Sequence, residues 1–573
     1  MSQIAFDETT LTIEYNLFDL PTAQHKAGLA GLLVMIESLR LREIPTLPRV
    51  DFKPNDVSIS FTKDSLQTVF DDLYDVEMFE IKLKKLRTKK ENGKEIEVPP
   101  KHTEIVTTPS KGKKKKSQTY YIYDDFQPKG AFLQTFFSDG NGKWVKLWRD
   151  TLWNILRVKP ASRGVYEERA SDKTGKQKSS SKSKKFWEEI LKAYKAREKG
   201  QKRTKSLSSS IVLGMESQNA EKVPFEGTIE DNFLLNFWHI VSLIFVPREL
   251  KIERSEDKIS INRSKELGFV LVIPEPSNLQ NFVEEAIQVT RSLPIGVMGY
   301  RPKIALIDLY HEGGLEFLYW FARNKMDNTG EFLLNLQAIE IFHLERQDDS
   351  AHQLSSERIL PRGSMIRDYQ LVRDSIKNPF YKMVVLKNLV DGNPWYKDAL
   401  NVLQNQPWPI FVLSKTTPSE IPLFCFDVKS KFQSIEKNIQ MKKEANLMSE
   451  RDFDDKLARC IYKLVQWYIW RRTEEKSGKK YEEFKTNKDD KGKILYPAEY
   501  RDSLGKVSSD AFLSMRGRSE DAFVEYFTGT ICSVPQFLPE EEYLSVVKAL
   551  SIDWQKVKAL SMLAVSANSF LSE

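Results

Sequence analysis

Cysteine is scarce in this 573-residue chain, which contains only Cys425, Cys460 and Cys532. No two of them have CxxC spacing, so the sequence provides neither a disulfide framework nor the ligand pattern of a structural zinc site. Isolated thiols are typical of proteins that stay in a reducing compartment. We therefore expect a cytoplasmic protein.

Histidine is also scarce, with six residues, so metal and acid–base sites can be checked one at a time. No His-Asp dipeptide occurs, and HEGG at His311 lacks the second histidine of an HExxH zinc site. The sequence contains no Gly-Gly-Asp-Asp and no GxSxG, and Gly175-Lys176 lacks the spacing and the Ser or Thr of a phosphate loop. We interpret His239 as a buried structural residue. The sequence therefore predicts no enzymatic activity, no metal and no cofactor.

Long apolar runs are missing as well. The longest, residues 233–246, has 14 residues and includes Asn236, His239 and Ser242. A membrane-spanning helix needs about 20 mostly apolar residues. The first ten residues, MSQIAFDETT, are polar and acidic and do not resemble a secretory signal. We expect a soluble protein without a membrane partner.

Positive charge is abundant in two places. Residues 82–116 carry 13 Lys or Arg against 4 acidic residues, and residues 163–205 carry 15 against 6. Each stretch has a net charge of +9. Since the whole chain has a net charge of +7, the remainder sums to −11. Such concentration is typical of nucleic-acid binding, although solvated loops can also be this basic.

The pattern of apolar residues predicts an α+β fold with three regions. Residues 1–210 would form a basic α+β nucleic-acid-binding region with flexible Lys-rich loops at 82–116 and 163–205. Residues 211–440 would form a mixed α/β scaffold, and residues 448–573 an all-α helical bundle. An apolar fraction of 40% is in the range of a folded protein.

The stretch from Asn16 to Arg40 predicts a short strand at 17–20, a turn at Pro21 and a long helix capped by Thr22. Buried leucines and isoleucine recur at helical spacing in that helix. Its small residues, Gly28 and Gly31 among them, would let another backbone come close. The favoured interpretation of His25 and Lys26 is structural.

Further elements are predicted from periodicity. Ile81 to Thr88 and Thr119 to Tyr123 would be the arms of a long hairpin with a Lys-rich tip at 111–116. Trp144, Trp148 and Leu152 would share a buried helix face, and an amphipathic basic helix would run over residues 186–199. Strands are predicted at 267–274, 303–310 and 408–414, and helices at 278–293, 331–346 and 396–405. Three further helical segments are predicted after residue 448.

Two segments of the sequence resemble a known family. NLFDLPTAQHKAGLAGLL, from Asn16, is similar to the opening of the large subunit of type I CRISPR effector (Cascade) complexes of the Myxan subtype, close to subtype B. SSSIVLGMESQNAEKVPFEG, from Ser208, and NFLLNFWHIVSLIFVPREL, from Asn232, match the same family. The resemblance implies a small-subunit-like helical domain at the C-terminus, which some systems also make separately. Met441 and Met448 are the candidate internal starts.

The resemblance also implies a function and partners. The N-terminal part would contact the 5′ end of a guide RNA, recognise a short DNA motif flanking the target and help to open double-stranded target DNA. The C-terminal bundle would line the path of the separated strands. Other Cascade subunits (backbone, guide-end and small subunits) and a separate helicase-nuclease recruited on target binding would be partners.

Charge and loop context then select candidate residues. Phosphate contact is predicted for basic residues of both stretches and of the C-terminal bundle: Lys113, Lys114, Lys115, Lys116, Lys184, Lys185, Lys202, Arg203, Arg471, Arg472, Arg516 and Arg518. Asn and Gln can pair with adenine edges, and Lys can bind guanine or phosphate. Gln218, Asn219 and Lys222 are therefore candidates for reading the flanking motif, with an ordinary polar loop as the alternative.

Two other functions remain open from the sequence. The chain could be a scaffold whose basic loops bind proteins or are only solvated. It could also be a nucleic-acid enzyme of an unrecognised type, which would show metal-dependent cleavage.

Overall fold

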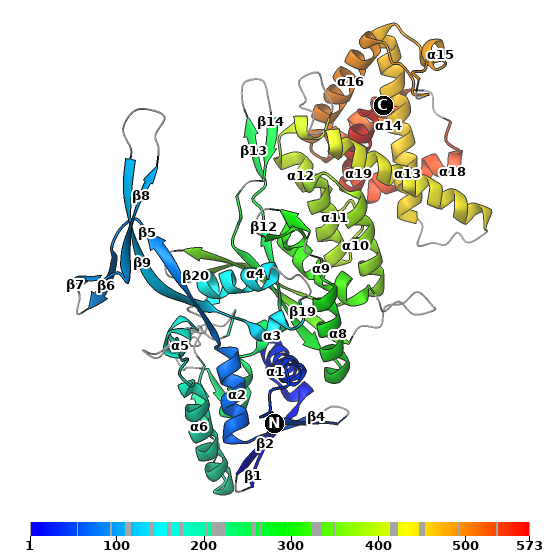
Figure 1. Ribbon diagram of the computed structural model, residues 1–573. Helices are drawn as coiled ribbons and strands as arrows, with labels where there is room; N and C mark the ends of the chain where they lie inside the picture. The colour runs from blue at the N-terminus through cyan, green and yellow to red at the C-terminus, as the bar shows by residue number, and fades with distance from the viewer. Residues whose placement is uncertain are drawn as a thin grey trace. The chain divides into compact units, whose positions relative to one another are not determined.

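The computed structural model shows an α+β fold that divides into two compact units. Unit 1 comprises residues 1–247 and 267–361, and unit 2 comprises residues 248–266 and 362–573 (Figure 1). Mixed sheets lie in unit 1, and helices dominate unit 2. The structure describes residues 2–7, 9–53, 56–91, 94–108, 116–137, 142–156, 162–170, 176–201, 203–207, 212–213, 225–254, 259–263, 265–294, 296–298, 301–323, 335–347, 350–412, 422–445, 453–490, 492–534 and 537–571.

Helix α1 (Ala23–Leu41) runs through the core of unit 1. It begins where the sequence predicts, because the side chain of Thr22 accepts a hydrogen bond from the backbone N–H of His25. The predicted apolar face is confirmed as buried: Leu29, Leu32, Leu33, Ile36 and Leu39. The strand expected at 17–20 is wrong. That segment forms the 3-10 turn η1 (Leu17–Asp19), because the side chain of Asn16 accepts the backbone N–H of Phe18.

Two glycines of α1 allow a second backbone to lie directly on the helix. A Cβ atom at Gly28 would collide with the carbonyl oxygen of Leu234, and one at Gly31 would collide with that of Phe237. Helix α7 (Ile229–Leu234) and the 3-10 turn η3 (Trp238–Ile240) therefore approach α1 more closely than any side chain would allow. The close approach predicted from the small residues is confirmed.

A five-stranded sheet forms the centre of unit 1. Its strand order is β18 (Leu306–Ile307), β12 (Leu243–Pro247), β15 (Phe269–Pro276), β19 (Leu336–Gln347) and β20 (Ser350–Ile359). Strands β12 and β18 pair in parallel, and the other neighbours are antiparallel. All eight residues of β15 are buried, so both of its faces are covered.

Helices cover the two faces of β15. Gly313 of α9 (Tyr310–Ala322) lies against the side chain of Val270, whereas Lys26 of α1 forms an ion pair with Glu275. Alternate residues of a strand point to opposite faces. Because Val270 and Glu275 differ by an odd number of positions, α9 and α1 lie on opposite sides of the strand.

The remaining sheets of unit 1 are smaller. A four-stranded antiparallel sheet has the order β1 (Gln3–Asp7), β2 (Thr10–Asn16), β4 (Asp56–Phe61) and β3 (Arg49–Phe52). A three-stranded sheet has the order β5 (Val76–Leu83), β9 (Lys116–Pro128) and β8 (His102–Thr108). Two-stranded pairs are β6 (Arg87–Glu91) with β7 (Lys94–Val98), β10 (Thr204–Ser206) with β11 (Glu226–Thr228), and β16 (Val297–Met298) with β17 (Arg301–Pro302).

The basic hairpin differs from its predicted form in its pairing. The segment 81–88 was expected to be one arm, but it spans the end of β5 and the start of β6. Strand β9 pairs with β5 along its second half, and the partner of its first half is β8. The hairpin β6–β7 is inserted between β5 and β8. Figure 1 shows β8 and β9 running together away from α2 (Lys63–Leu73).

The other helices of unit 1 are α3 (Ala131–Gln134), α4 (Lys143–Thr151) with the π-helical turn η2 (Leu152–Leu156), α5 (Ser162–Arg169), α6 (Ser181–Glu198), α8 (Leu279–Ser292) and the 3-10 turn η4 (Lys303–Ala305). The predicted helix at 278–293 corresponds to α8. The predicted buried face of Trp144, Trp148 and Leu152 is confirmed, since all three side chains are buried.

Three further secondary-structure predictions are wrong. Of the helix expected at 331–346, residues 331–334 lie outside the described residues and residues 336–346 belong to strand β19, because pairing with β15 and β20 outweighs the helix-forming Leu, Gln and Glu residues there. The strand expected at 303–310 is reduced to the two residues of β18 after η4. The strand expected at 408–414 begins with the 3-10 turn η5 (Trp408–Ile410), which Pro407 and Pro409 favour over an extended ladder.

Unit 2 is helical apart from the hairpin of β13 (Lys251–Arg254) and β14 (Ile259–Asn262). Its helices are α10 (Gly363–Ser375), α11 (Pro379–Asp391), α12 (Ala399–Asn405), α13 (Pro422–Glu444), α14 (Phe453–Ser477), α15 (Tyr481–Phe484), α16 (Ala498–Arg516), α17 (Glu520–Gly529), the 3-10 turn η7 (Ile531–Ser533), α18 (Glu540–Ile552) and α19 (Trp554–Asn568). The three helical segments predicted after residue 448 correspond to α14, to α17, and to α18 with α19.

The core of unit 2 is continuous across the predicted boundary at residue 448. Val428, Phe432 and Ile435 of α13 belong to the same buried cluster as Ile461 of α14 and Leu560 of α19. The two compact units divide at residues 247, 266 and 361, and the three predicted regions stay a prediction.

The contact between α1 and the 234–240 segment generates a test. We expect Gly28→Ala and Gly31→Ala each to lower the free energy of unfolding by about 1–3 kcal/mol, because the added methyl group displaces a backbone carbonyl in a packed core. Chemical unfolding followed by tryptophan fluorescence measures the change. Gly164→Ala in α5 is the matched control, since a Cβ atom there meets open space. Equal stability of all three variants would contradict the packing constraint.

Candidate nucleic-acid interface

Several predicted contact residues lie outside the described part of the chain. These are Lys113, Lys114, Lys115, Lys202, Gln218, Asn219 and Lys222. Lys116 is the first residue of β9, and its side chain is also outside the described set. The structure places the flanks of these segments, namely β8 with β9 and β10 with β11. The contact roles of these residues stay predictions.

Helix α6 carries the best-described group of predicted basic residues. Its buried side chains include Phe186, Trp187, Ile190 and Ala193. The ring of Phe186 stacks on Phe233 with 4.2 Å between centroids. The predicted inward and outward faces are confirmed, and the exposed lysines are Lys184, Lys185, Lys192, Lys195 and Lys199.

Polar contacts fix the start of α6 on α2. The backbone N–H of Ser180 donates to Asp71 at 2.7 Å, and the side chain of Ser180 accepts the backbone N–H of Lys182 at 3.2 Å. Gln67 of α2 donates to the carbonyl oxygen of Ser180 at 3.2 Å. The lysine face of α6 is therefore held by a rigid helix, although the sequence places it within a run expected to be flexible.

A small cleft lies beside α6, with a volume of about 200 Å³. Lys182 and Lys185 of α6 line it together with Lys205 of β10. The rings of Phe186 and Phe233 form its apolar floor. The pKa of Lys182 is lowered, first by burial and then by the positive charges of Lys185 and Lys205. Both carboxylate oxygens of Glu189 lie 3.0 Å from the Lys205 ammonium nitrogen. The cleft brings together three cations and one carboxylate.

Sequence reasoning selected only part of this group. Lys184, Lys185 and Arg203 were candidates, and all three are exposed. Lys182 and Lys205 were within the basic stretch but were not singled out. Lys205 lies beside α6 because its strand, β10, pairs with β11. Strand β11 is more than 20 residues further along the chain. No local signal in the sequence predicts that pairing.

The candidate arginines of unit 2 have partners within the chain. Arg471 and Arg472 are exposed on α14 and form ion pairs with Glu475 at 3.1 Å and 2.9 Å. Arg516 donates to the carbonyl oxygen of Gln404. Pairs of this exposed kind are weak, so Arg471 and Arg472 can exchange Glu475 for a phosphate at little cost.

Arg518 has a structural environment. It donates to the carbonyl oxygens of Ser514 at 2.6 Å and Ala522 at 3.1 Å, and its guanidinium carbon lies 4.7 Å from the ring centroid of Tyr526. These contacts connect the end of α16 to α17. The predicted phosphate contacts of Arg516 and Arg518 stay predictions.

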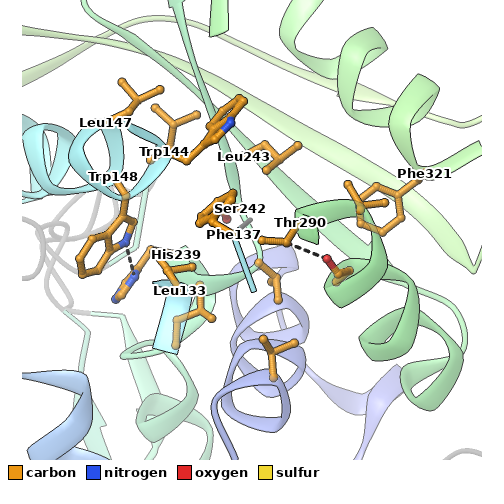
Figure 2. Close-up of a pocket in the computed structure, with 16 residues that line it drawn as sticks. Leu133, Phe137, Trp144, Leu147, Trp148, His239, Ser242, Leu243, Thr290 and Phe321 are labelled. Atoms are coloured by element: carbon orange, nitrogen blue, oxygen red, sulfur yellow. Dashed lines mark hydrogen bonds between the residues drawn. The ribbon is translucent and has the colours of Figure 1, made fainter. Parts of the chain in front are cut away.

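The tryptophans of α4 line an apolar cavity of about 40 Å³ in unit 1 (Figure 2). Trp144 and Trp148 project from the same helix toward Phe137 and His239, and the indole N–H of Trp148 donates to Nδ1 of His239 at 3.1 Å. Burial lowers the pKa of His239 to about 4. This geometry describes core packing, and it confirms the structural interpretations of both tryptophans and of His239.

His25 and Lys26 are also structural. His25 is buried, its Nδ1 lies 2.7 Å from the hydroxyl of Thr22, and burial lowers its pKa to about 4. Lys26 donates to Glu275 at 3.0 Å. His311, in the HEGG segment, lies 3.0 Å from Glu357. Within the described ranges, no three His, Cys, Asp or Glu side chains are placed to hold a metal ion.

Comparison with known families identifies the chain. Residues 44–331 match the type I-B CRISPR Cas8b N-terminal domain, and residues 336–568 match the type I-B CRISPR Cas8b C-terminal domain. The chain is thus a large subunit of a type I CRISPR effector complex. It belongs to the type I-B Cas8b family. No curated protein matches it. Among the helices that the structure describes, none is both long and apolar enough to cross a membrane.

His239, one of two buried histidines of unit 1 with a lowered pKa, makes stability depend on pH. His239 has a folded pKa of about 4 and a model-peptide value of 6.5, so the unfolded chain binds its proton first as the pH falls. The stability that neutral His239 gives the folded chain is complete above pH 6.5 and is lost as the pH falls from about 6.5 to about 4. We expect His239→Gln, which can still accept the Trp148 hydrogen bond, to take up about one proton fewer on unfolding near pH 5.

Denaturant titrations at neutral pH and near pH 5 measure this difference. His102→Gln is the control, because His102 is exposed on β8. The control should keep the pH dependence of the unchanged protein. An identical pH dependence of the His239→Gln variant would contradict the assignment.

Proposed function

We propose that this chain is a non-catalytic large subunit that recognises a short DNA motif flanking the target and contacts the 5′ end of the guide RNA. It also helps to open the target duplex and recruits a separate helicase-nuclease. The observation that carries the proposal is the exposed lysine face of α6 in a member of this family. Among the described residues, no carboxylate forms an ion pair with Lys184 or Lys185. These charges are available for a nucleic-acid backbone.

The chemistry of guide-directed recognition supports this assignment. Base pairing with the guide RNA reads the target sequence, so the protein needs backbone charge and a small number of base-edge contacts. Lysines on a rigid helix and on a hairpin tip suit phosphate contact, since a phosphate is bound by charge and not by base identity. Phosphates would also be contacted by Arg203, Arg471 and Arg472.

The two segments outside the described ranges keep distinct proposed roles. Lys113 to Lys115, which lie in the sequence between β8 and β9, and Lys116, the first residue of β9, would contact phosphates. Gln218 and Asn219, between β10 and β11, would read the flanking motif. Partners would be the guide RNA, double-stranded target DNA, the other subunits of the complex and the helicase-nuclease. A scaffold whose basic surfaces bind proteins is the competing function, and it predicts no specific RNA.

Sequencing the RNA that copurifies with the tagged protein from its host tests the proposal. We expect short RNAs that share one fixed 5′ segment and differ beyond it, because a guide-bound complex protects such RNAs. A random sample of cellular transcripts, or no RNA, would favour the scaffold function.

Replacing Lys113 to Lys116 by Ala tests the phosphate role. With about six phosphate contacts, affinity of the unchanged protein for DNA should fall roughly a thousandfold between 50 and 200 mM salt. The lysine variant should bind all sequences more weakly and show a smaller salt slope. Gln218→Ala and Asn219→Ala should instead relax the preference for the flanking motif. Binding curves for DNA with and without the motif measure both effects, and identical behaviour of the two groups would contradict the assignment.

A further inference from the structure

The cleft beside α6 combines features that the exposed lysine face lacks. Its three lysines come from two separate elements, α6 and β10, and converge on one hollow. Lys182 is partly buried, so its ammonium group is held in place, whereas Lys192 and Lys195 on the same helix point into solvent. The rings of Phe186 and Phe233 form a firm floor, because both are buried and stacked on one another.

The charges in the cleft are not balanced. Glu189 is the carboxylate that lines it, and both of its oxygens are engaged by Lys205. Glu168 also acts on Lys182, but burial and the charges of Lys185 and Lys205 outweigh the attraction of both carboxylates and lower the pKa of Lys182. A bound anion would relieve the repulsion among the three lysines and would compensate the burial of Lys182.

Phosphate is the anion that suits this arrangement. It presents several acceptor oxygens, so ammonium groups from different directions can bind it at once. The volume of about 200 Å³ is smaller than the range of about 300–1,000 Å³ typical of sites for drug-sized ligands. The hollow therefore suits one phosphate group of a longer molecule. The other exposed lysines of α6 would contact further phosphates of the same nucleic-acid strand.

We propose that the cleft is a discrete phosphate-binding site for a nucleic-acid strand, in which one phosphate group replaces Glu189 at Lys205 and is bound jointly by Lys182, Lys185 and Lys205. This inference rests on the proposed nucleic-acid function and assigns a particular position to it. The phosphate can belong to the backbone of the strand or to its 5′ end.

Fluorescence anisotropy with the full chain and a short single-stranded oligonucleotide tests the site. Lys205→Gln should weaken binding on the order of tenfold, the loss expected for one charge-assisted contact. Lys195→Gln removes the same charge from the exposed face of α6 and should cause only a small fraction of that loss. Glu189→Gln should tighten binding, because it removes the carboxylate that competes for Lys205.

Lys205 is exposed, so its replacement should leave the melting temperature unchanged, and this is measured for each variant. Comparing 5′-phosphorylated and 5′-hydroxyl oligonucleotides separates the two sources of phosphate. A preference for the 5′ phosphate that Lys205→Gln abolishes assigns a strand terminus. Equal affinity for both, with the loss in Lys205→Gln retained, assigns a backbone phosphate.

Two results would overturn the inference alone. If Lys205→Gln and Lys195→Gln lose the same amount of affinity for the oligonucleotide, the lysines act only as a diffuse positive field. Unchanged or weaker binding by Glu189→Gln would mean that no anion competes with this carboxylate. A wild-type chain that binds no oligonucleotide at any salt concentration would overturn the proposed function as well.

Discussion

The contact between α1 and the segment 234–240 is the constraint on which the rest of unit 1 depends. Gly28 and Gly31 bring the backbone carbonyls of Leu234 and Phe237 against the helix, where no side chain can intervene. The position of α7 follows from that contact. Phe233 of α7 then forms the floor on which Phe186 of α6 stacks. A backbone-to-helix contact in the core thus sets the position of the basic cleft at the surface.

Helix α6 shows how a strongly basic segment can be rigid. Long runs of like charge are expected to be solvated and mobile, because the charges repel. Here, apolar residues (Phe186, Trp187, Ile190 and Ala193) interrupt the lysines at helical spacing, and their burial compensates the repulsion along the exposed face. The backbone N–H of Ser180 donates to Asp71 of α2 and its carbonyl oxygen accepts from Gln67, and these hydrogen bonds fix the start of the helix. The result is an ordered positive surface, which holds charges at fixed positions for a fixed ligand.

Local signals predicted much of the fold. The caps and apolar stripes of α1, α6, α8 and the helices after residue 448 depend on interactions within the helix and on one buried face, so a window of sequence contains them. Strand β19 was mistaken for a helix because its residues favour helices locally, and only its neighbours in the sheet make it a strand. The hairpin predicted with arms at 81–88 and 119–123 is right only where residues 81–83 pair with 121–123, since β9 also pairs with β8 and the sequence does not show which residues pair.

The sequence by itself determined the α+β class, the two concentrations of positive charge, and the resemblance that the family matches confirm. It also determined that Lys192 and Lys195 lie on the outer face of a helix, because helical spacing is a local property. Only the tertiary structure decided that Lys205 returns to Lys182 and Lys185, and that Arg516 and Arg518 bind carbonyl oxygens within unit 2. Such contacts join residues far apart in the chain, and the packing of the whole unit selects them.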